Sequence, residues 1–557
     1  MSLLADLLHG GWIRAVDHAL AQSLRRARPD TPDAVLVAAA LASRALADGH
    51  ARLPLAHAAE LLEPTEDGLA PPALPDHGEW RATLAASPWV HAIATDGGRE
   101  PAPADRVLVL EADAIALRRY RELEARLATA LLARAHAADT PRLQLLTGGP
   151  GTGKTTRVAG VLAAAALARD ANDPPLRIAL AAPTGKAAAR LAEAVREAIA
   201  AQVADGSLPE ALAATLPATA TTVHRLLGWQ RDGTWRHGAA QPLAMDLVVV
   251  DEASMIDLPL MAALIEAVPA EATLVLVGDP DQLPSVEAGA VLAALCTASA
   301  VPGAPLAAHR EHLVRAHRQA ADFDAPVLAA AVRAGDADAA LDALRGGRLR
   351  GVHWRRDGDR ALAAAILAEV VPAYRALALA PDAAAALQAA RGLRVLCALH
   401  EGAAGTIALN AAIGLALDPW HRGAGWFQGR LLLVTANSPR QGLANGDVGV
   451  AWPDAQGEPR VWFEGEDGPR AWLPAALPAH EPAWALTVHK AQGSEFERVW
   501  LALPERGARV LSRELLYTGI TRARRQLHLW ASETALRQAI DRPAERWSGL
   551  AVRLQPG

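Results

Sequence analysis

The chain has 557 residues, enough for several domains that each bury a core. Hydrophobic residues make up 51% and charged residues 21%, which is typical of a globular protein and excludes a disordered one. The net charge of −6 excludes a broad basic surface for duplex DNA, so any nucleic-acid contact has to be local.

Two cysteines, Cys296 and Cys397, are too few for a disulfide framework or a four-ligand zinc site, which favours a reducing compartment. The first residues, MSLLADLLHGGW, lack a basic leader, and the apolar runs elsewhere are interrupted before they reach membrane-spanning length. We therefore expect a cytoplasmic protein that makes no membrane contact.

Residues 1–105 alternate helical stretches such as DAVLVAAALASRALADG with the Pro-rich loop LEPTEDGLAPPALP. They carry no chemical motif. We predict a helical N-terminal domain that packs against, or docks on, something else.

Alternating strands and helices follow. In residues 106–305 the apolar runs LQLL, RIALAA, LVVVDE and TLVLVGD are each followed by a loop and a helical segment, which predicts a buried parallel sheet. A second α/β set, 306–557, contains RVLCALH, VWLALP and LHLWA. Within it, residues 437–482 are rich in Gly, Pro and Trp with short strand-like pieces, which predicts a small β-barrel insertion.

The stretch GGPGTGKTT follows the first of these strands and opens a helix. Gly148, Gly151 and Gly153 let backbone N–H groups approach phosphates at a helix N-terminus, and Lys154 reaches toward the β- and γ-phosphates. Thr155 offers a hydroxyl to Mg²⁺. A glycine-rich turn without a ligand is the alternative, but the strand-loop-helix context favours a nucleotide site.

Two further segments carry acidic and amide groups. Asp251 and Glu252 end the apolar strand LVVV, where one carboxylate would hold Mg²⁺ and the other would activate the attacking water. An ordinary helix N-terminus is the alternative. Gln282 follows TLVLVGD and would sense the γ-phosphate, and a simple turn is its alternative.

Lysine is rare, with only Lys154, Lys186 and Lys490 in the chain. All three fall in predicted strand-to-helix loops. Chance placement of so few residues is the alternative to a functional reason.

The motifs, taken in order, resemble those of superfamily 1B helicases: GGPGTGKTT, APTGKAAARL, TTVHRLLG, VVVDEASMID, GDPDQLPSV, LVRAHRQ, TVHKAQGSEF and LLYTGITRARRQL. The chain most resembles the RecD family, the alpha subunits of exodeoxyribonuclease V. The resemblance implies an α/β fold with two RecA-like P-loop motor domains, a helical N-terminal domain and an SH3-like barrel inserted in the second motor domain.

The resemblance also implies roles for individual residues. Lys154, Asp251, Glu252 and Gln282 would be catalytic, with Arg318 and Arg522 as arginine fingers, and Thr155 and Asp251 would hold Mg²⁺. The ATP-binding residues would be Gly148, Gly149, Pro150, Gly151, Thr152, Gly153, Lys154, Thr155, Thr156, Gly493 and Glu495, of which Glu495 would accept the ribose hydroxyls. The DNA-binding residues would be Pro183, Thr184, Gly185, Lys186, Thr222, His224, Thr487, His489 and Lys490.

The implied activity is ATP-driven 5′ to 3′ translocation on single-stranded DNA and unwinding of duplex DNA ends. The implied partners are RecB-like and RecC-like subunits in a heterotrimer for recombinational repair. No acidic cluster in the sequence indicates a nuclease site, so cleavage would belong to a partner. The alternatives are a stand-alone helicase of the same branch, a scaffold subunit with an inactive motor, and an RNA helicase.

Overall fold

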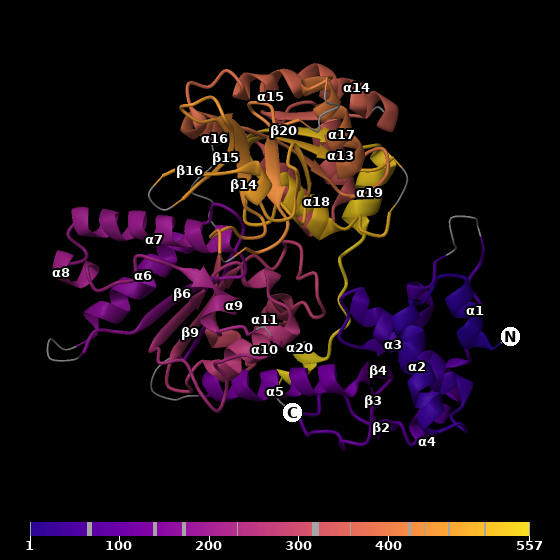
Figure 1. The fold of residues 1–557 in the computed structure, drawn as a ribbon. Coiled ribbons are helices and arrows are strands. Elements are labelled where there is room, and N and C mark those ends of the chain that lie inside the picture. The colour runs from indigo at the N-terminus through magenta and orange to yellow at the C-terminus, as the bar shows by residue number, and fades with distance from the viewer. Residues whose placement is uncertain are drawn as a thin grey trace.

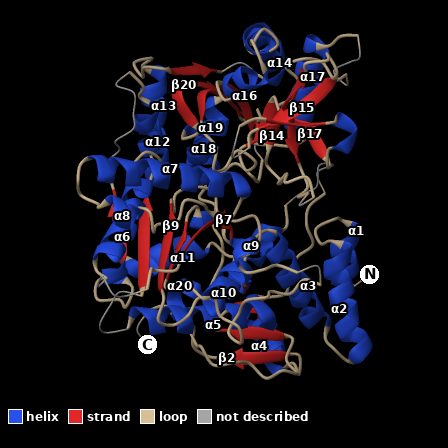
Figure 2. Cartoon of the chain, turned by 60° about the vertical axis from the view of Figure 1, so that its left-hand side comes forward, coloured by secondary structure: helices blue, strands red, loops and turns tan. Residues whose placement is uncertain are grey.

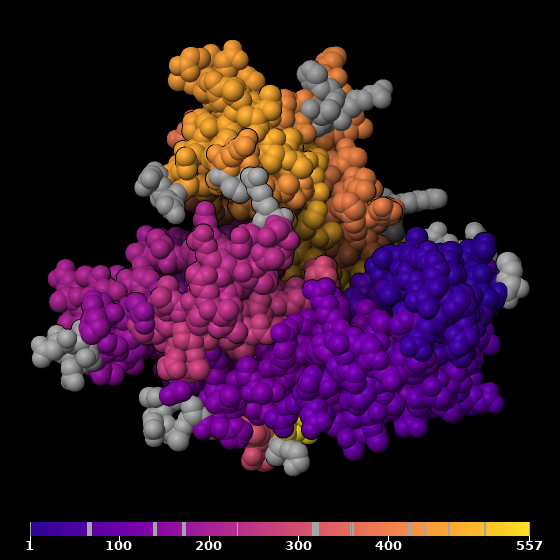
Figure 3. All heavy atoms as spheres, turned by 60° about the horizontal axis from the view of Figure 1, so that its bottom comes forward, coloured from indigo at the N-terminus to yellow at the C-terminus, as the bar shows by residue number. Residues whose placement is uncertain are grey.

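The computed structural model describes residues 2–63, 69–136, 142–169, 174–230, 232–314, 322–356, 358–420, 425–438, 440–465, 468–505 and 508–555. They form an N-terminal part and two α/β domains (Figure 1). Figure 3 shows the N-terminal part and the first α/β domain side by side on the lower face of the molecule, with the second α/β domain above them.

The N-terminal part is built around α3, whose apolar residues are buried on nearly all sides. It also contains a four-stranded sheet in the order β1-β4-β3-β2, which the sequence analysis did not predict. Because β4 pairs with both β1 and β3, this part runs past residue 105 to Leu117. Its elements are α1 (Leu3–His9), α2 (Ala15–Ala27), α3 (Asp33–Ala47), β1 (Leu53–Pro54), η1 (Leu55–Leu61), α4 (His77–Ala86), β2 (Val90–Ile93), β3 (Leu108–Glu111) and β4 (Ala114–Leu117).

The first α/β domain has a six-stranded parallel sheet in the order β10-β5-β9-β8-β6-β7, which confirms the parallel arrangement predicted from the apolar runs. Alternate residues of β8 serve opposite faces: Val248 and Val250 join one core cluster and Val249 another. The strands are β5 (Leu143–Gly148), β6 (Ile178–Ala182), β7 (Thr221–Thr222), β8 (Leu247–Val250), β9 (Thr273–Gly278) and β10 (Arg310–Leu313).

Helices cover both faces of this sheet. They are α5 (Arg118–Ala135), α6 (Lys154–Leu167), α7 (Gly185–Ala204), α8 (Glu210–Ala213), α9 (Val223–Leu226), η2 (Ala253–Met255), α10 (Leu258–Ala267), α11 (Val291–Ser299) and η3 (Ala307–His309). Because β10 pairs with β5, the sheet continues beyond residue 305, where the sequence analysis ended this domain.

The second α/β domain repeats the plan with a five-stranded parallel sheet in the order β11-β20-β19-β12-β18, and Figure 2 shows its helices packed around the strands. The strands are β11 (Val352–Arg355), β12 (Leu393–Cys397), β18 (Ala485–Thr487), β19 (Phe496–Ala502) and β20 (Ala523–Trp530). The helices are α12 (Ala325–Ala334), α13 (Ala337–Arg345), α14 (Asp359–Glu369), α15 (Val371–Leu377), α16 (Ala383–Ala390), α17 (Thr406–Leu417), α18 (Arg513–Ile520) and α19 (Glu533–Asp541).

A small antiparallel sheet in the order β16-β15-β14-β13-β17 is inserted between α17 and β18, with Leu432, Val461 and Phe463 in its core. Within the described residues its end strands β16 and β17, each three residues long, do not pair with each other. The sheet is therefore open where a barrel was predicted. Its elements are β13 (Leu431–Val434), β14 (Val448–Pro453), β15 (Pro459–Phe463), β16 (Arg470–Trp472), η4 (Pro474–Ala476) and β17 (His480–Pro482).

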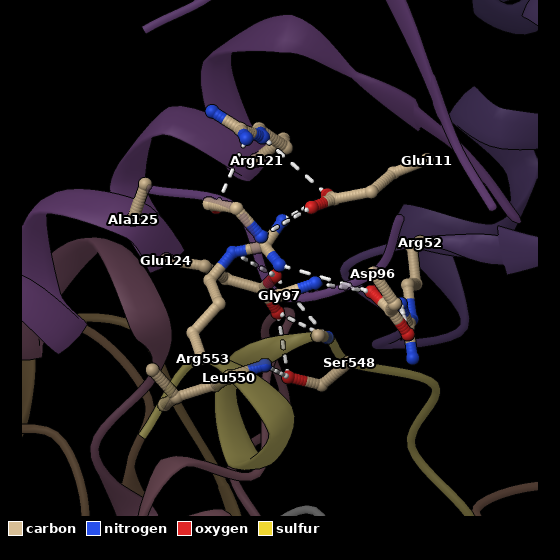
Figure 4. A network of polar contacts seen from close by, with 12 residues as sticks. Arg52, Asp96, Gly97, Glu111, Arg121, Glu124, Ala125, Ser548, Leu550 and Arg553 are labelled. Carbon is tan, nitrogen blue, oxygen red and sulfur yellow. Dashed lines mark hydrogen bonds and ion pairs between the residues drawn. The ribbon is translucent and has the colours of Figure 1, made fainter. Parts of the chain in front are cut away.

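After α19 the chain leaves the second domain, and residues 542–555, the C-terminal strap, return to the other two parts. The strap ends in α20 (Leu550–Arg553), which packs on α5 and α11. Figure 4 shows Arg553 buried between Glu111 and Glu124, and the backbone N–H of Gly549 donates to Glu124 at 2.9 Å. Among the described residues, no helix is long and apolar enough to cross a membrane.

Candidate functional site

The loop between β5 and α6 wraps around the end of the Lys154 side chain. Lys154 Nζ donates to the carbonyl oxygens of Gly148 and Gly149, at 2.7 and 2.9 Å. Gly153 caps α6 in the left-handed region with φ 83°, a conformation that favours glycine. The loop thus places backbone N–H groups and an ammonium at one helix N-terminus, which is the arrangement that binds phosphates.

Two carboxylates lie at the end of β8. The backbone N–H of Asp251 donates to Ala181 at 2.9 Å, so the neighbouring strand β6 fixes its position. Burial, followed by the charge of Glu252, raises the pKa of Asp251 to about 6, while the charge of Lys154 opposes the shift. Glu252 has φ 50°, a left-handed conformation that costs a non-glycine residue on the order of 1–2 kcal/mol.

Gln282 lies in the loop after β9, and its side chain is nearly inaccessible. Its Nε2 donates to Asp279 Oδ2 at 3.2 Å, and the same oxygen accepts from the hydroxyl of Tyr517, in α18, at 3.1 Å. Burial raises the pKa of Asp279, and the nearby Lys154 charge opposes this shift. Asp279 and Tyr517 lie inside the quoted motifs GDPDQLPSV and LLYTGITRARRQL, but no local pattern in the sequence indicates that the two segments meet.

The predicted catalytic and nucleotide-binding residues largely share one cleft of about 150 Å³ between the two α/β domains. Its lining includes Pro150, Gly151, Thr152, Gly153, Lys154, Thr155, Thr156, Asp251, Glu252, Gln282, Gly493, Glu495 and Arg522. Gly148 lies at the back of the loop, and Gly149 lines a neighbouring cavity. Arg318 lies outside the described residues.

Arg522 approaches the cleft from the second domain. Its Nε donates to the carbonyl of Thr518 at 3.1 Å and its guanidinium donates to the carbonyl of Ser494 at 3.2 Å. The side chain is therefore almost fully buried and is held in one orientation by its own domain.

Arg190, which the sequence analysis missed, reaches across the cleft from α7. Its guanidinium donates to the carbonyl of Gly493 and, at 3.3 Å, to Glu495 Oε2. Arg524 also binds Glu495, at 2.8 Å, and although burial favours the neutral acid, the surrounding arginines lower the pKa of Glu495. The only available sequence signal was the spacing of Arg190, four residues after Lys186 in a helix that begins beside the cleft.

A larger cavity of about 740 Å³ adjoins the cleft on the side of α12 and α18. Pro150, Gly151, Thr152 and Glu495 line both spaces, and Gly149, Phe323, Tyr517 and Arg524 line the larger one. The cleft and the larger cavity therefore share part of the loop between β5 and α6 as a wall. Together they have room for a group larger than a phosphate chain.

The residues proposed for magnesium fit a divalent cation. Thr155 and Asp251 line the same cleft, and Asp251 is a buried carboxylate whose pKa is raised first by that burial and then by the charge of Glu252, so a cation beside it would favour its ionised form. Mg²⁺ is commonly held by one or two oxygen ligands of this kind together with phosphates. Among the described residues, no group of three or more His, Cys, Asp or Glu side chains is arranged to hold a metal.

The predicted DNA-binding residues of the first domain lie together at the ends of β6 and β7, where Ala182 pairs with Thr222. Thr184 caps α7 and Thr222 caps α9, each accepting from a backbone N–H at 3.2 Å. Burial, then the charge of Arg394, lowers the pKa of Lys186 to about 8.

These residues have neighbours that the sequence did not reveal. A Cβ on Gly185 would lie 3.3 Å from the Cβ of Ala444, so the loop of Pro183–Lys186 touches the segment that precedes β14 in the small sheet. His224 lies beside Trp229 and Trp235, with ring centroids 6.2 and 5.5 Å away. Burial lowers the pKa of His224, which favours its neutral form.

The three predicted residues of the second domain follow β18. The hydroxyl of Thr487 accepts from the N–H of Lys490 at 3.3 Å, and Lys490 Nζ binds Glu481 at 2.7 Å. Burial lowers the pKa of His489, with the charge of Arg546 acting in the same direction. The two groups of predicted DNA contacts therefore lie on different α/β domains, each at the carboxyl end of a parallel strand.

Comparisons with known proteins bear on both α/β domains and on the N-terminal part. A model described as "AAA domain" matches residues 133–288, one described as "UvrD-like helicase C-terminal domain" matches 482–530, and one described as "RecBCD enzyme subunit RecD, N-terminal domain" matches 9–114. The RecBCD enzyme subunit RecD of Mycobacterium tuberculosis is 38% identical over 573 aligned positions, covering 98% of this chain and 95% of that protein. The chain belongs to the RecD family.

The chain is also similar to other known proteins. RecD of Haemophilus influenzae is 35% identical, covering 74% of this chain and 70% of its own length. The ATP-dependent RecD2 DNA helicase of Deinococcus radiodurans is 33% identical, covering 72% of this chain but 49% of that protein. Among solved structures, a Bacteroides Pif1 bound to single-stranded DNA aligns with 72% of this chain and 91% of its own, at 14% identity and a TM-score of 0.39.

Proposed function

We propose that this RecD-family chain is an ATP-dependent DNA helicase that translocates 5′ to 3′ along single-stranded DNA. The observation that carries the proposal is the cleft between the two α/β domains, which brings Lys154, Asp251, Glu252 and Gln282 of one domain together with Arg522 of the other. ATP bound there would touch both domains at once, so its hydrolysis would change how they contact each other.

The chemistry follows from the positions of the side chains. Lys154 leaves its two carbonyl acceptors to bind the β- and γ-phosphates, and Glu252 accepts the proton of the attacking water. Gln282 binds the γ-phosphate, and Arg522 stabilises the negative charge of the transition state. Thr155 and Asp251 would hold Mg²⁺, which supplies positive charge to the phosphates. We assign the second arginine finger to Arg318 on the family resemblance alone.

We place the nucleoside in the larger cavity, which shares the phosphate-binding loop with the cleft. Glu495 would accept the ribose hydroxyls beside Gly493. In the present arrangement Glu495 is bound by Arg190 and Arg524, so it would have to exchange one of these partners for the ribose.

We assign DNA binding to the two strand-end groups described above. On the first domain they are Pro183, Thr184, Gly185, Lys186, Thr222 and His224, and on the second domain they are Thr487, His489 and Lys490. Because each group belongs to a different domain, opening and closing of the cleft would change the distance between the two DNA-binding groups. Alternating changes of this kind would move the chain along a DNA strand. The 5′ to 3′ direction rests on the family resemblance.

We further propose that the chain is the motor subunit of a RecBCD-type complex, with RecB-like and RecC-like partners, acting on double-strand ends in the cytoplasm. A relative named as a RecBCD subunit is 38% identical over 98% of this chain, whereas the RecD2 helicase is 33% identical over 72% of it, which favours the subunit over the stand-alone alternative. The match of residues 9–114 to a RecD N-terminal model favours this part as the docking domain.

The deciding experiment is ATP-dependent unwinding of duplexes with a 5′ or a 3′ single-stranded tail, comparing the native chain with Lys154→Gln, alone and with its partners. We expect only the 5′-tailed duplex to open, and only with Lys154 present. Unwinding that survives the substitution would show that this chain is not the motor, and absence of DNA-stimulated ATP hydrolysis would favour an inactive scaffold. A preference for the 3′ tail would reverse the direction. Competition by a matched RNA strand separates a DNA from an RNA helicase.

A further inference from the structure

The loop that carries Gln282 is bound by the second α/β domain through buried hydrogen bonds. The hydroxyl of Tyr517 donates to Asp279 Oδ2 at 3.1 Å, and the N–H of Leu283 donates to Thr518 Oγ1 at 2.9 Å. The Gln492 amide donates to the carbonyl of Leu283 at 3.0 Å. The Gln282 loop belongs to the first domain, but these hydrogen bonds make its position depend on the position of the second domain.

Asp279 links these contacts to the amide of Gln282. A carboxylate accepts hydrogen bonds and donates none, so the group that faces Asp279 Oδ2 at 3.2 Å is the NH₂ of Gln282. The carbonyl end of that amide then remains for the cleft, which Gln282 lines. Tyr517 and Gln282 bind the same carboxylate oxygen, so movement of either donor changes the position of the other.

Tyr517 also touches the phosphate-binding loop. A Cβ on Gly149 would lie 3.1 Å from the Tyr517 hydroxyl, so this hydroxyl lies between that loop and Asp279. The next residue, Thr518, accepts from Arg522 Nε through its carbonyl oxygen. One turn of α18 thus contacts the phosphate loop, the Gln282 loop and the arginine of the cleft.

We propose that Tyr517 is a positioning residue that orients Gln282 through Asp279 and so couples the ATP state of the cleft to the approach of the second α/β domain. The proposal rests on the proposed ATPase and helicase function and adds to it a hydrogen-bonded relay, Tyr517–Asp279–Gln282. Tyr517 need not touch ATP to act, because its effect passes through the carboxylate.

The test is Tyr517→Phe, which removes one hydroxyl and keeps the ring. The chain offers a matched control in Tyr374→Phe, because Tyr374 is also a buried tyrosine of the second domain, and its hydroxyl donates to the carbonyl of Trp484 at 2.7 Å, away from the cleft. Each variant is assayed for ATP affinity, for the kcat of DNA-stimulated hydrolysis and for base pairs unwound per ATP.

For Tyr517→Phe we expect ATP affinity to stay within about twofold while kcat falls about tenfold or more, the scale of a lost hydrogen bond to a charged group. Tyr374→Phe should leave both unchanged. Asp279→Asn should lower kcat similarly, and the double variant should be no worse than the single ones, because all of them break the same relay.

Three results would overturn the inference: an unchanged kcat in Tyr517→Phe, an equal loss in Tyr374→Phe, or additive losses in the double variant. If Tyr517→Phe does not fold, Asp279→Asn measured against Tyr374→Phe decides the question in the same way. A native chain that hydrolyses no ATP would instead contradict the proposed function itself, so the two failures are distinguishable.

Discussion

Protonation of His50 should weaken the attachment of the C-terminal strap. The His50 ring stacks on Trp547 with centroids 4.0 Å apart, and its Nδ1 accepts from the backbone N–H of Trp547 at 3.0 Å. Burial lowers the pKa of His50 to about 4, and the charges of Arg546 and Arg509 act in the same direction. A protonated Nδ1 has no lone pair for the Trp547 N–H, so the folded contact requires the neutral ring.

The size and sign of the effect follow from proton linkage. The unfolded chain titrates near 6.5, so between pH 6.5 and pH 4 it binds a proton that the folded protein excludes. Stability is therefore fully present above pH 6.5 and is lost as the pH falls toward 4. The shift corresponds to about 3 kcal/mol in total, of which about 2 kcal/mol is lost between pH 7 and pH 5.

The assay is urea unfolding at several pH values, followed by tryptophan fluorescence, for the native chain and His50→Asn. Asparagine keeps an acceptor near the Nδ1 position but does not titrate, so the native chain should lose about 2 kcal/mol more than the variant between pH 7 and pH 5. His77→Asn, at an exposed position, is the control and should follow the native chain. Parallel pH dependence in native and His50→Asn proteins would refute the reasoning.

Three further substitutions test packing and strain. Arg553→Met removes the buried cation that Glu111 and Glu124 share, and it should lower the free energy of unfolding by about 3–5 kcal/mol. Arg525→Met, on the exposed surface, should cost about 1 kcal/mol or less, so urea unfolding of the two variants separates a buried from an exposed ion pair. Glu252→Gly should relieve the strain of the left-handed backbone at this position and raise the free energy of unfolding by about 0.5–1 kcal/mol, while it abolishes ATP hydrolysis. A lower free energy of unfolding would contradict the assignment of backbone strain to Glu252. Gly148→Ala would place a Cβ 2.6 Å from the carbonyl oxygen of Leu313, so we expect a loss of about 1–3 kcal/mol and of nucleotide binding, measured by thermal unfolding and equilibrium titration.

The central strands of both parallel sheets could be predicted because their signal is local. Continuous apolar runs such as LVVVD have to be buried on both faces, and β8 is buried on both faces. The loop that we propose to bind phosphates and the acidic pair of Asp251 and Glu252 could be singled out for the same reason, since each directly follows such a run. Short or charged strands gave no comparable signal: β10 reads REHL and β1 has two residues, and both are defined by pairing with distant strands.

Contacts between distant segments were beyond sequence reasoning. Tyr517 and Asp279 are 238 residues apart in the sequence, and neither motif contains a pattern that indicates contact with the other. Arg190 was missed because an arginine on an alanine-rich helix ordinarily reads as a solvated side chain, and only the packing of the second domain against α7 brings it to Glu495. The composition of a motif shows which groups are present, whereas the fold decides which of them meet.

The second α/β domain is attached to the rest of the molecule in two physically different ways. The C-terminal strap is held by apolar and ionic burial: Leu550 and Leu554 join the core of the first domain, and Arg553 is almost inaccessible. At the cleft, by contrast, the contacts are polar: a hydrogen bond from Tyr517 to the carboxylate of Asp279 and an ion pair between Arg190 and Glu495. Removing apolar side chains from a core costs about 2–5 kcal/mol each, and that loss is not recovered in water. A hydrogen bond to a charged group contributes about 1.5–3 kcal/mol net, but it can be replaced by one to water or to a phosphate. The strap can therefore keep the domain attached if the contacts at the cleft exchange, which is the combination that the proposed opening and closing around a nucleotide requires.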